Sequence, residues 1–324
     1  MLDFPDFYAK KIVLVFPKNG DRMLIKNDNF IVLDINNNTK IQISCYKIFS
    51  IYVVGGFSIT TGLIEKSKKF GFSIVFFTVN FKIYETINFK MEGNTLLRKK
   101  QYICDKSLAI GKNIIINKIE NQKEALKKIR KPQFLDGIIL LNQNIEKLIK
   151  NNFNNSEIMG IEGISAKIYF NRIFEGLEWK GRQPRVKRDK INLLLDIGYT
   201  ILFNYIEGIL NIYGFDVYKG NLHQEFYKRK SLVCDIIEPF RTIVDYKIRK
   251  SFMLKQLEYT YTINNSQYNI NWRDCEKFIQ IILEEIISYR ECIFKYIQSY
   301  YRWFMKDKDF CEFPKARLIK NDID

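Results

Sequence analysis

Short hydrophobic runs separated by turn residues fill the first part of the chain. Residues 11–53 contain KIVLVF, MLIK, FIVLDI, KIQISC and KIFSIYVV, with clusters such as PKNGDR and NNNT between them. Runs of β-branched and aromatic residues bounded by Asn and Gly are typical of strands joined by tight turns, and the Asn19-Gly20 dipeptide favours a hairpin. This pattern predicts an antiparallel β meander.

The spacing of the hydrophobic positions changes further along the chain. Residues 60–70 predict a short helix that ends at Gly71, and residues 73–78 predict a buried strand. After IYETINF the strand pattern disappears, and the apolar residues then recur with a helical period, for which Asn94 is the expected N-cap. The boundary between the two patterns lies near residue 90.

Three longer helices are expected in the second region. Ser156 is the predicted cap of SEIMGIEGISAKIYFNRIFEGL, in which Gly160 and Gly163 would let another element approach closely. Asp189 begins a long buried helix, and CEKFIQIILEEIISYRECIFKYIQSYYRWFMK predicts one amphipathic helix. Residues 264–271 predict an exposed loop or a tight hairpin between helices.

The order of these elements predicts the fold class. We expect an α+β protein in which a small antiparallel β-rich N-terminal domain, residues 1–90, precedes a larger all-α domain, residues 91–324. A chain of 324 residues is long enough for two hydrophobic cores, and 47% hydrophobic residues supply them.

Charge indicates a polyanionic partner. The formal net charge is +16, from 52 Lys and Arg against 36 Asp and Glu, which favours nucleic acid or an anionic membrane surface. The abundance of Lys, Ile, Asn, Phe and Tyr is also what an AT-rich genome encodes, so part of this charge carries no function.

The cysteines and the N-terminus bear on location. The six cysteines are scattered without a C-x-x-C pair, which excludes a zinc ribbon and argues against a disulfide framework. Asp3 and Asp6 lie where a signal peptide needs positive charge, and no apolar run approaches the roughly 20 residues of a membrane span. We expect a soluble, cytoplasmic protein that does not act at a membrane.

The candidate chemistry surrounds the one histidine of the chain. In GNLHQEFYKRKSLVCDIIEPFR, Asp235 and Glu238 follow His223; three residues apart, they should share a helix face, which Pro239 ends. An oxygen-rich site with one imidazole and no thiolate suits Mg²⁺ or Mn²⁺ and phosphoryl transfer. Glu162 is the best candidate for a further ligand, because a carboxylate on an apolar helix is costly unless it is paired, protonated or bound to metal.

A plainer interpretation of the same residues stays open. A lone histidine beside carboxylates is more often a satisfied residue than a ligand, and Glu162 could face solvent. The cations Lys228, Arg229 and Lys230 could equally form an ordinary solvated face. A serine or cysteine hydrolase is set aside because the chain has no G-x-S-x-G motif.

Several motifs together resemble a family of CRISPR-associated endonucleases and integrases, CRISPR-associated protein one. The family's Gly-Leu-Asp-x-x-x-Gly-x-Leu-His is similar to GFDVYKGNLH, and its Ser-Leu-x-x-Asp-Leu-x-Glu-Pro-Phe-Arg is similar to SLVCDIIEPFR, followed by Val244 and Asp245. Upstream, EGISAKIYF resembles Glu-Gly-x-x-Ala-x-x-Tyr-Phe. The sequence departs from the family at Asp196, at Phe215, and at FYKRK, which replaces Pro-Gly-Arg after the histidine.

The resemblance implies a specific activity. Members are metal-dependent DNA endonucleases and integrases of CRISPR adaptation, an antiviral defence, and join the 3′-OH ends of short DNA fragments into the repeat array by transesterification. Carried over to this chain, Glu162, His223 and Glu238 would bind Mg²⁺ or Mn²⁺, and Asp235 would support the site or contact the metal through water.

The resemblance also implies partners. They are double-stranded DNA, from both the spacer precursor and the repeat array, and a second copy of the chain in a homodimer built through the β domain. A small adaptation protein, CRISPR-associated protein two, would complete a heterohexamer in the prokaryotic cytoplasm.

DNA binding would need cations near the site, because neutralised phosphates drive such binding. The candidate contacts are Arg182, Arg185, Lys187, Arg188, Lys228, Arg229 and Lys230. A non-catalytic basic scaffold that only binds nucleic acid is the alternative. A peripheral membrane protein is disfavoured because the C-terminal helical segment also carries Glu284, Glu285 and Glu291.

Overall fold

The computed structural model describes residues 3–78, 81–88 and 94–318. The chain divides into two compact units, Met1–Asn94 with Gly208–Phe215 and Thr95–Glu207 with Asp216–Asp324. The long helix α7 (Lys190–Tyr213) contributes to both units, so the division does not follow the chain order alone.

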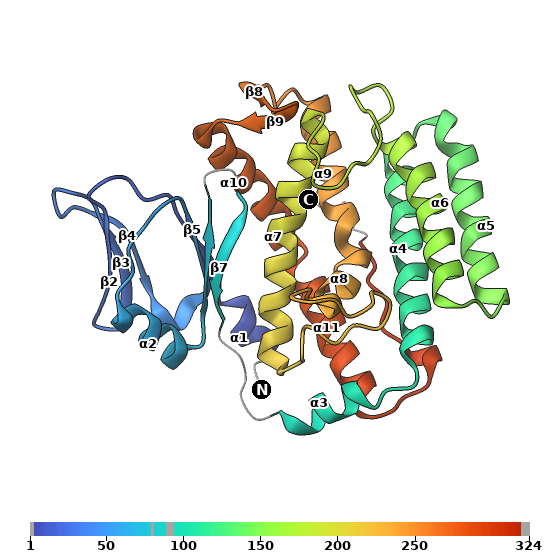
Figure 1. The fold of residues 1–324 in the computed structure, drawn as a ribbon, viewed down its shortest axis with the longest axis horizontal. Helices are drawn as coiled ribbons and strands as arrows, with labels where there is room; N and C mark the ends of the chain where they lie inside the picture. Colours follow the sequence, from blue (N-terminus) through green and yellow to red (C-terminus); the bar gives the residue numbers. More distant parts are fainter. Residues whose placement is uncertain (1–2, 79–80, 89–93, 319–324) are drawn as a thin grey trace. The chain divides into compact units, whose positions relative to one another are not determined.

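The first unit contains two small sheets. Its elements are α1 (Phe4–Tyr8), β1 (Lys11–Val15), β2 (Arg22–Lys26), β3 (Asn29–Leu33), β4 (Thr39–Ser44), η1 (Cys45–Lys47), β5 (Ile48–Val54), α2 (Thr61–Phe70), β6 (Ser73–Phe77) and β7 (Ile83–Ile87). Strands β2, β3 and β4 form an antiparallel meander, and β1, β5, β6 and β7 form a mixed sheet (Figure 1). Phe30, Ile51 and Ile74, all fully buried, lie in the core of this unit.

The prediction of an antiparallel N-terminal domain is correct for β2–β4 and wrong for the second sheet. There β1 pairs with β5 in parallel, β5 pairs with β6 in parallel, and only β7 is antiparallel to its neighbour. Every residue of β5 and β6 is buried, and α2 makes the crossover between them. Strands buried on both faces are typical of parallel sheets.

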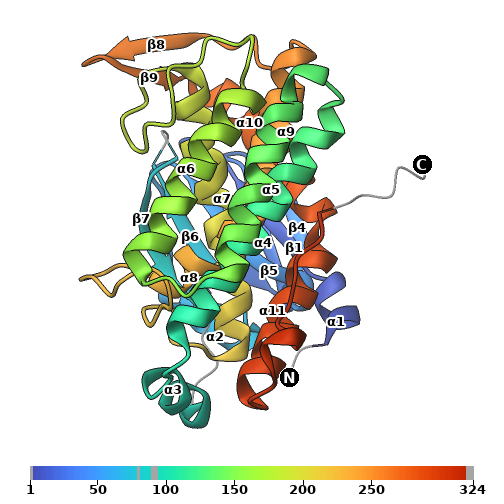
Figure 2. The same cartoon turned by 90° about the vertical axis from the view of Figure 1, so that its right-hand side faces the viewer.

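The second unit is helical apart from one hairpin. Its elements are α3 (Thr95–Tyr102), α4 (Ser107–Ile129), η2 (Pro132–Phe134), α5 (Leu135–Lys150), α6 (Asn155–Ile173), the first part of α7, α8 (Ser231–Ile236), η3 (Glu238–Phe240), α9 (Arg241–Met253), β8 (Tyr261–Asn264), β9 (Gln267–Ile270), α10 (Trp272–Ser288), α11 (Arg290–Met305) and η4 (Phe310–Glu312). Helices α4, α5 and α6 lie side by side (Figures 1 and 2).

Local signals set most helix ends. The predicted cap at Gly71 is confirmed, with φ of 71°, and Asp189 accepts the Asn192 N–H at 2.7 Å at the start of α7. The prediction of Ser156 as a cap is wrong. The cap is Asn154, two residues before Ser156, and it forms a capping box with Glu157.

The end of the chain differs from the single helix that was expected. The predicted C-terminal helix is two helices, α10 and α11, which meet at Tyr289. The predicted hairpin at residues 264–271 is confirmed as β8 and β9. An Asn271 side chain that accepts the Asp274 N–H begins α10, so the polar end of the hairpin also caps the helix.

Glycines allow close packing at other positions than those predicted. Within the described residues, nothing lies within 4 Å of where a Cβ would stand on Gly160 or Gly163, so the predicted close approach there is wrong. A Cβ on Gly198 in α7 would lie 2.5 Å from Cγ1 of Val244 in α9. Helices α7 and α9 therefore pack together at a position that only glycine leaves free.

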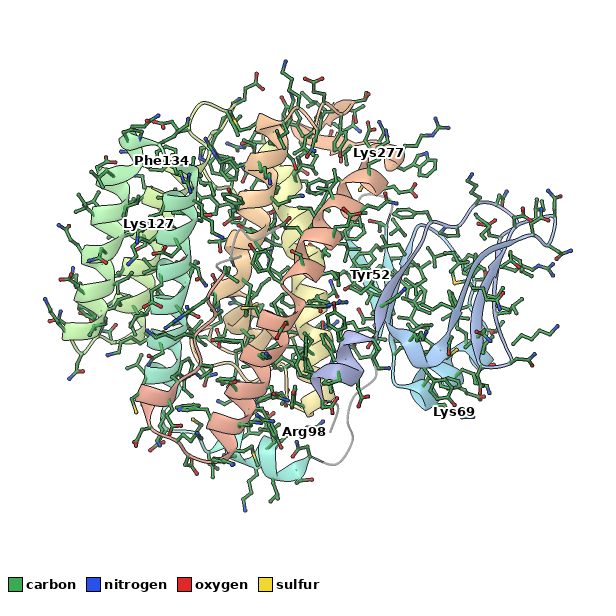
Figure 3. The ribbon with its side chains drawn as sticks, turned by 180° about the vertical axis from the view of Figure 1, so that it is seen from behind. Tyr52, Lys69, Arg98, Lys127, Phe134 and Lys277 are labelled. Carbon is green, nitrogen blue, oxygen red and sulfur yellow. The ribbon has the colours of Figure 1, made fainter. Side chains whose placement is uncertain are left out.

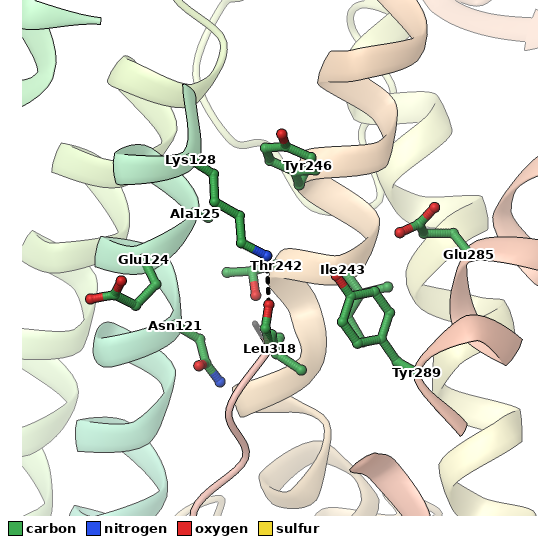
Figure 4. A pocket seen from close by; sticks show the side chains of 10 residues that line it. All are labelled: Asn121, Glu124, Ala125, Lys128, Thr242, Ile243, Tyr246, Glu285, Tyr289 and Leu318. Atoms are coloured by element: carbon green, nitrogen blue, oxygen red, sulfur yellow. Dashed lines mark hydrogen bonds between the residues drawn. The ribbon is translucent and has the colours of Figure 1, made fainter. Parts of the chain in front are cut away.

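The C-terminal segment is fastened to α4. The Asn117 amide donates to the Ala316 carbonyl at 3.0 Å and accepts its N–H at 2.8 Å. Lys128 donates to the Leu318 carbonyl at 2.7 Å, beside a cavity of about 20 Å³ that has room for little more than a water molecule (Figure 4). These bonds fix the position of α4, in which Lys118 directly follows Asn117.

Helix α7 qualifies the expectation that no segment could span a membrane. Among the described residues it alone is long and apolar enough, with a mean hydropathy of 1.4 over its apolar window. Because 78% of that window is buried inside the protein, α7 has the properties of a core helix.

The close approach at Gly198 predicts an asymmetric effect of two Gly→Ala substitutions. Gly198→Ala should lower the free energy of unfolding by about 1 to 3 kcal/mol, because Val244 cannot move freely in a packed core. Gly160→Ala, in an open helical position, should raise it by about 0.5 to 1 kcal/mol. Urea unfolding followed by circular dichroism measures both; equal effects of the two substitutions would contradict this packing.

Candidate metal centre

A buried lysine joins two of the predicted ligands. Lys118 of α4 forms ion pairs with Glu162 of α6 and, at 2.5 Å from Nζ to Oε2, with Glu238 of η3. The side chain of Lys118 is 8% exposed and that of Glu238 is 5% exposed, so both charges lie in the interior. Three elements distant in sequence therefore bring two carboxylates to one position.

The charges of this cluster depend on one another. Burial opposes the ionised form of Glu238, but Arg241 and Lys118 outweigh it and lower the pKa of Glu238 to about 2. Burial likewise opposes the ammonium of Lys118, and the pKa of Lys118 is nevertheless raised by Glu238 and Glu162. Glu238 and Lys118 are thus both ionised throughout the neutral pH range.

A hydrogen-bond network continues from Glu238 into the core. Arg241 donates from Nε to Glu238 Oε1 at 3.0 Å, and its guanidinium lies 4.6 Å from the centre of the Tyr199 ring. Tyr199 in turn donates to Asp245, and burial raises the pKa of Asp245 to about 7. Oε1 of Glu238 is therefore held in place by Arg241, which itself packs on the Tyr199 ring.

Asp235 holds the loop that carries His223. Its carboxylate accepts the N–H groups of Asn221 at 2.6 Å, Leu222 at 3.1 Å and His223 at 3.0 Å, and it lies 2.7 Å from Nδ1 of His223. Four contacts occupy the acceptor sites of one carboxylate. Asp235 therefore positions the imidazole, in keeping with the supporting role that the resemblance implies for it.

A glycine lets this loop close over α8. A Cβ on Gly220 would lie 2.7 Å from Cβ of Ser231 and 2.9 Å from the His223 carbonyl oxygen. With Asp235 on Nδ1, the nitrogen left for a ligand is Nε2, an arrangement common behind metal-binding histidines. The imidazole also contributes, after Arg241 and Lys118, to the low pKa of Glu238.

The donor types of the predicted set, two carboxylates and an imidazole nitrogen, are those that suit a hard divalent cation. Oε2 of Glu238 is buried, and the Lys118 ammonium contacts it at 2.5 Å. Within residues 3–78, 81–88 and 94–318, no group of three or more His, Cys, Asp or Glu side chains is arranged closely enough to hold a metal ion. The assignment of Glu162, His223 and Glu238 as metal ligands stays a prediction.

The seven candidate DNA contacts divide into two sets. Arg182 is paired with Asp196 at 2.7 Å, and Lys230 is paired with Glu207 at 2.7 Å, so both contribute to the fold. The other five have exposed or half-buried side chains: Arg185, Lys187, Arg188, Lys228 and Arg229. Their role in DNA binding stays a prediction.

Surface cations are spread over both units. Figure 3 labels Lys69 in the first unit and Lys127 and Lys277 in the second. Lys127 and Lys277 are paired with Glu124 and Asp274 in adjacent turns of their own helices. Such exposed pairs are ordinary helix surface, so net charge alone does not locate a binding face.

The sequence contained a signal for Lys118 that was missed. Ile114, Ile115 and Lys118 have the spacing of one helix face, and both isoleucines are buried. A lysine on an apolar face indicates a buried partner carboxylate. Arg241 and Tyr199 carried no comparable signal, because only the fold brings them beside Glu238.

The low pKa of Glu238 predicts a pH-dependent contribution to stability. Because this pKa, about 2, lies below the ordinary 4.5, the ionised carboxylate stabilises the fold above pH 4.5, and the contribution is lost as the pH falls towards 2. Glu238→Gln should therefore lower the free energy of unfolding at pH 7 by up to about 3 kcal/mol, and this difference should shrink below pH 4.5.

Urea titrations in EDTA at several pH values between 3 and 7 measure this difference. Glu284→Gln, at an exposed position of α10, is the control and should show no such pH dependence. A difference between wild type and Glu238→Gln that is constant from pH 7 to pH 3 would show that Glu238 is not held ionised by the cluster.

Comparison with known proteins assigns the family. The family described as CRISPR associated protein Cas1 matches residues 14–283. A CRISPR-associated endonuclease Cas1 of Thermodesulfovibrio yellowstonii is 32% identical over 220 residues, which are 64% of this chain and 69% of the relative.

Two solved structures have the same fold. A casposase bound to integration product is 21% identical with a TM-score of 0.77, over 97% of each chain. A chain of a Cas6-RT-Cas1–Cas2 complex is 19% identical with a TM-score of 0.77, and the match covers 96% of this chain and 36% of that longer one. The match over residues 14–283 places the chain in the Cas1 family of CRISPR-associated proteins.

Proposed function

We propose that this protein is a metal-dependent DNA endonuclease and integrase of CRISPR adaptation, which joins the 3′-OH ends of new spacers to the repeat array by transesterification. The observation that carries the proposal is the convergence of Glu162 and Glu238, from separate elements, on one buried cation. The Thermodesulfovibrio yellowstonii relative is named an endonuclease, and the casposase was solved with an integration product.

Each residue of the site has a stated role in this proposal. Glu162, Glu238 and Nε2 of His223 would hold Mg²⁺ or Mn²⁺, whose Lewis acidity stabilises charge on a reacting phosphate. Asp235 fixes the imidazole through Nδ1, and Arg241 fixes Glu238 through Oε1. Lys118 forms ion pairs with both carboxylates and would have to move away from them to admit the metal.

The partners follow from the same proposal. The substrate is double-stranded DNA, contacted by the five exposed or half-buried cations named above, and the chain acts as a homodimer. One structural relative belongs to a Cas6-RT-Cas1–Cas2 complex, which supports a partner of the Cas2 kind. We propose that the two proteins assemble as a heterohexamer. The proposed location is the prokaryotic cytoplasm.

Removing any one ligand should abolish strand joining. Glu162→Gln, His223→Ala and Glu238→Gln should each lower the rate of joining a fluorescent 3′-OH duplex to a repeat by at least about 100-fold, because each removes metal-dependent stabilisation worth several kcal/mol. Calorimetric titration with Mn²⁺ should show weaker metal binding in the same three variants.

Asp136→Asn is the matched control, because Asp136 is a carboxylate of the same unit with an ion pair to Arg172 at the surface. It should retain both joining and Mn²⁺ binding. Undiminished joining in all three ligand variants would refute the assignment of the site.

One observation favours a non-catalytic DNA-binding scaffold as the second candidate. Lys118 and Arg241 together already balance the charges of Glu162 and Glu238, and a neutralised cluster needs no metal to be stable. This candidate predicts salt-sensitive DNA binding without any product that depends on Mn²⁺. Joined product in Mn²⁺ that disappears in EDTA would exclude it.

A further inference from the structure

Helices α7 and α9 touch through two neighbouring pairs of residues. The first pair is Gly198 and Val244, where a Cβ on the glycine would lie 2.5 Å from Cγ1 of the valine. The second pair is Tyr199 and Asp245, whose side chains are joined by a hydrogen bond from the hydroxyl to the carboxylate. Tyr199 is 7% exposed and Asp245 is 1% exposed. Because close packing and a buried hydrogen bond fix the helices at this level, the Tyr199 ring has little freedom to move.

The Tyr199 ring packs against the guanidinium of Arg241, the first residue of α9. Cζ of Arg241 lies 4.6 Å from the centre of the ring, within the range of a cation–π contact. Cζ of Arg182 lies 5.4 Å from the same centre. Of these two guanidiniums, that of Arg241 also pairs with Glu238, so the ring is one side chain away from a predicted metal ligand.

The contact of Arg241 with Glu238 uses one nitrogen and one oxygen. Nε of Arg241 donates to Oε1 of Glu238 at 3.0 Å, whereas Oε2 lies 2.5 Å from Nζ of Lys118. Arginine and a carboxylate frequently pair through two parallel hydrogen bonds, which would occupy both oxygens. The single bond leaves Oε2 to the position of the Lys118 ammonium, where the proposed metal would bind.

The ring opposes a second bond from Arg241. To reach Oε2 as well, the guanidinium would have to turn relative to Glu238. Such a turn would break its contact with the Tyr199 ring, which the bond to Asp245 and the packing of α7 on α9 hold in place. A planar guanidinium stacks well on an aromatic face, so this contact has a preferred orientation.

We propose that Tyr199 is a positioning residue for the metal centre: it holds Arg241 in its single contact with Glu238, and so leaves Oε2 of that carboxylate open to a divalent cation. The inference rests on the proposed function, because it takes Glu238 as a metal ligand. It assigns Tyr199 no contact with the metal or with DNA. The whole effect of the ring on the site passes through Arg241.

Removing the ring should weaken metal binding. Tyr199→Leu frees the guanidinium to pair with both oxygens of Glu238, so that Mn²⁺ has to compete with Arg241 for Oε2. We expect the dissociation constant for Mn²⁺ to rise by about 10-fold, as for other residues that support metal ligands. Calorimetric titration of the full chain and the paramagnetic resonance signal of free Mn²⁺ measure this constant without DNA. Circular dichroism checks the fold.

A substitution of Arg241 separates positioning from packing. Arg241→Lys keeps the positive charge but lacks the fork of donors that grips both oxygens of a carboxylate. In the Arg241→Lys background, Tyr199→Leu should therefore change the dissociation constant for Mn²⁺ by less than about 2-fold. A ring that only packed in the core would have the same effect in both backgrounds.

Two control variants separate metal binding from stability. Tyr199→Phe keeps the ring between α7 and α9 and removes the hydroxyl; it should lower the stability of the fold, because Asp245 loses a partner, and change Mn²⁺ affinity by less than about 2-fold. Tyr205→Leu removes another buried tyrosine of α7, on a different face of the helix. It should lower stability without weakening Mn²⁺ binding.

The outcomes distinguish this inference from the proposed function. If Tyr199→Leu binds Mn²⁺ like the wild type while Glu238→Gln binds it more weakly, Tyr199 is only a core residue and the proposed function stands. Equal weakening in both Arg241 backgrounds would also overturn the inference. If the wild type binds no Mn²⁺, both fail. Tyr199→Met, which fills more of the space, gives the same comparison if Tyr199→Leu does not fold.

Discussion

The ion pairs of Lys118 with Glu162 and Glu238 are the interaction on which the second unit depends. Each of these three charges would be costly to bury alone, so α4, α6 and η3 must meet at this point or leave an unpaired charge in the core. The capping box that begins α6 and the bonds between Asn117 and Ala316 both act on helices that carry this cluster. The same ion pairs thus hold the helices together and position the carboxylates of the candidate site.

Asp235 and Glu238, the two carboxylates that follow the histidine, have different structural roles. Asp235 organises backbone and ring on one side, whereas Glu238 belongs to the charged cluster and connects through Arg241 to Tyr199.

The sequence predicted those features that depend on neighbouring residues. The caps at Gly71 and Asp189, the hairpin at residues 264–271 and the change from strands to helices are local, and all are confirmed. The parallel pairing of β1 with β5 was not predicted, because it depends on a crossover that hydrophobic runs do not reveal.

For the site, motif and chemistry predicted Glu162, His223 and Glu238 as metal ligands. They did not predict the lysine that pairs with the two glutamates. The pairing of Glu162 was expected from the cost of a carboxylate on an apolar helix, and Lys118 is its partner. Arg182 is predicted to contact DNA because it is basic; in the structure it is paired with Asp196, and its role in DNA binding stays a prediction. Sequence alone does not distinguish a cation that folds the protein from one that binds a ligand.

We propose that Glu162 and Glu238 exchange the ammonium of Lys118 for a divalent cation. The most direct measurement is a crystal structure with Mn²⁺, in which anomalous scattering locates the metal. We expect a peak between the two carboxylates, next to Nε2 of His223, with the Lys118 side chain moved away from its place between them. A peak elsewhere, or Lys118 still in contact with both carboxylates in crystals that contain Mn²⁺, would contradict this account.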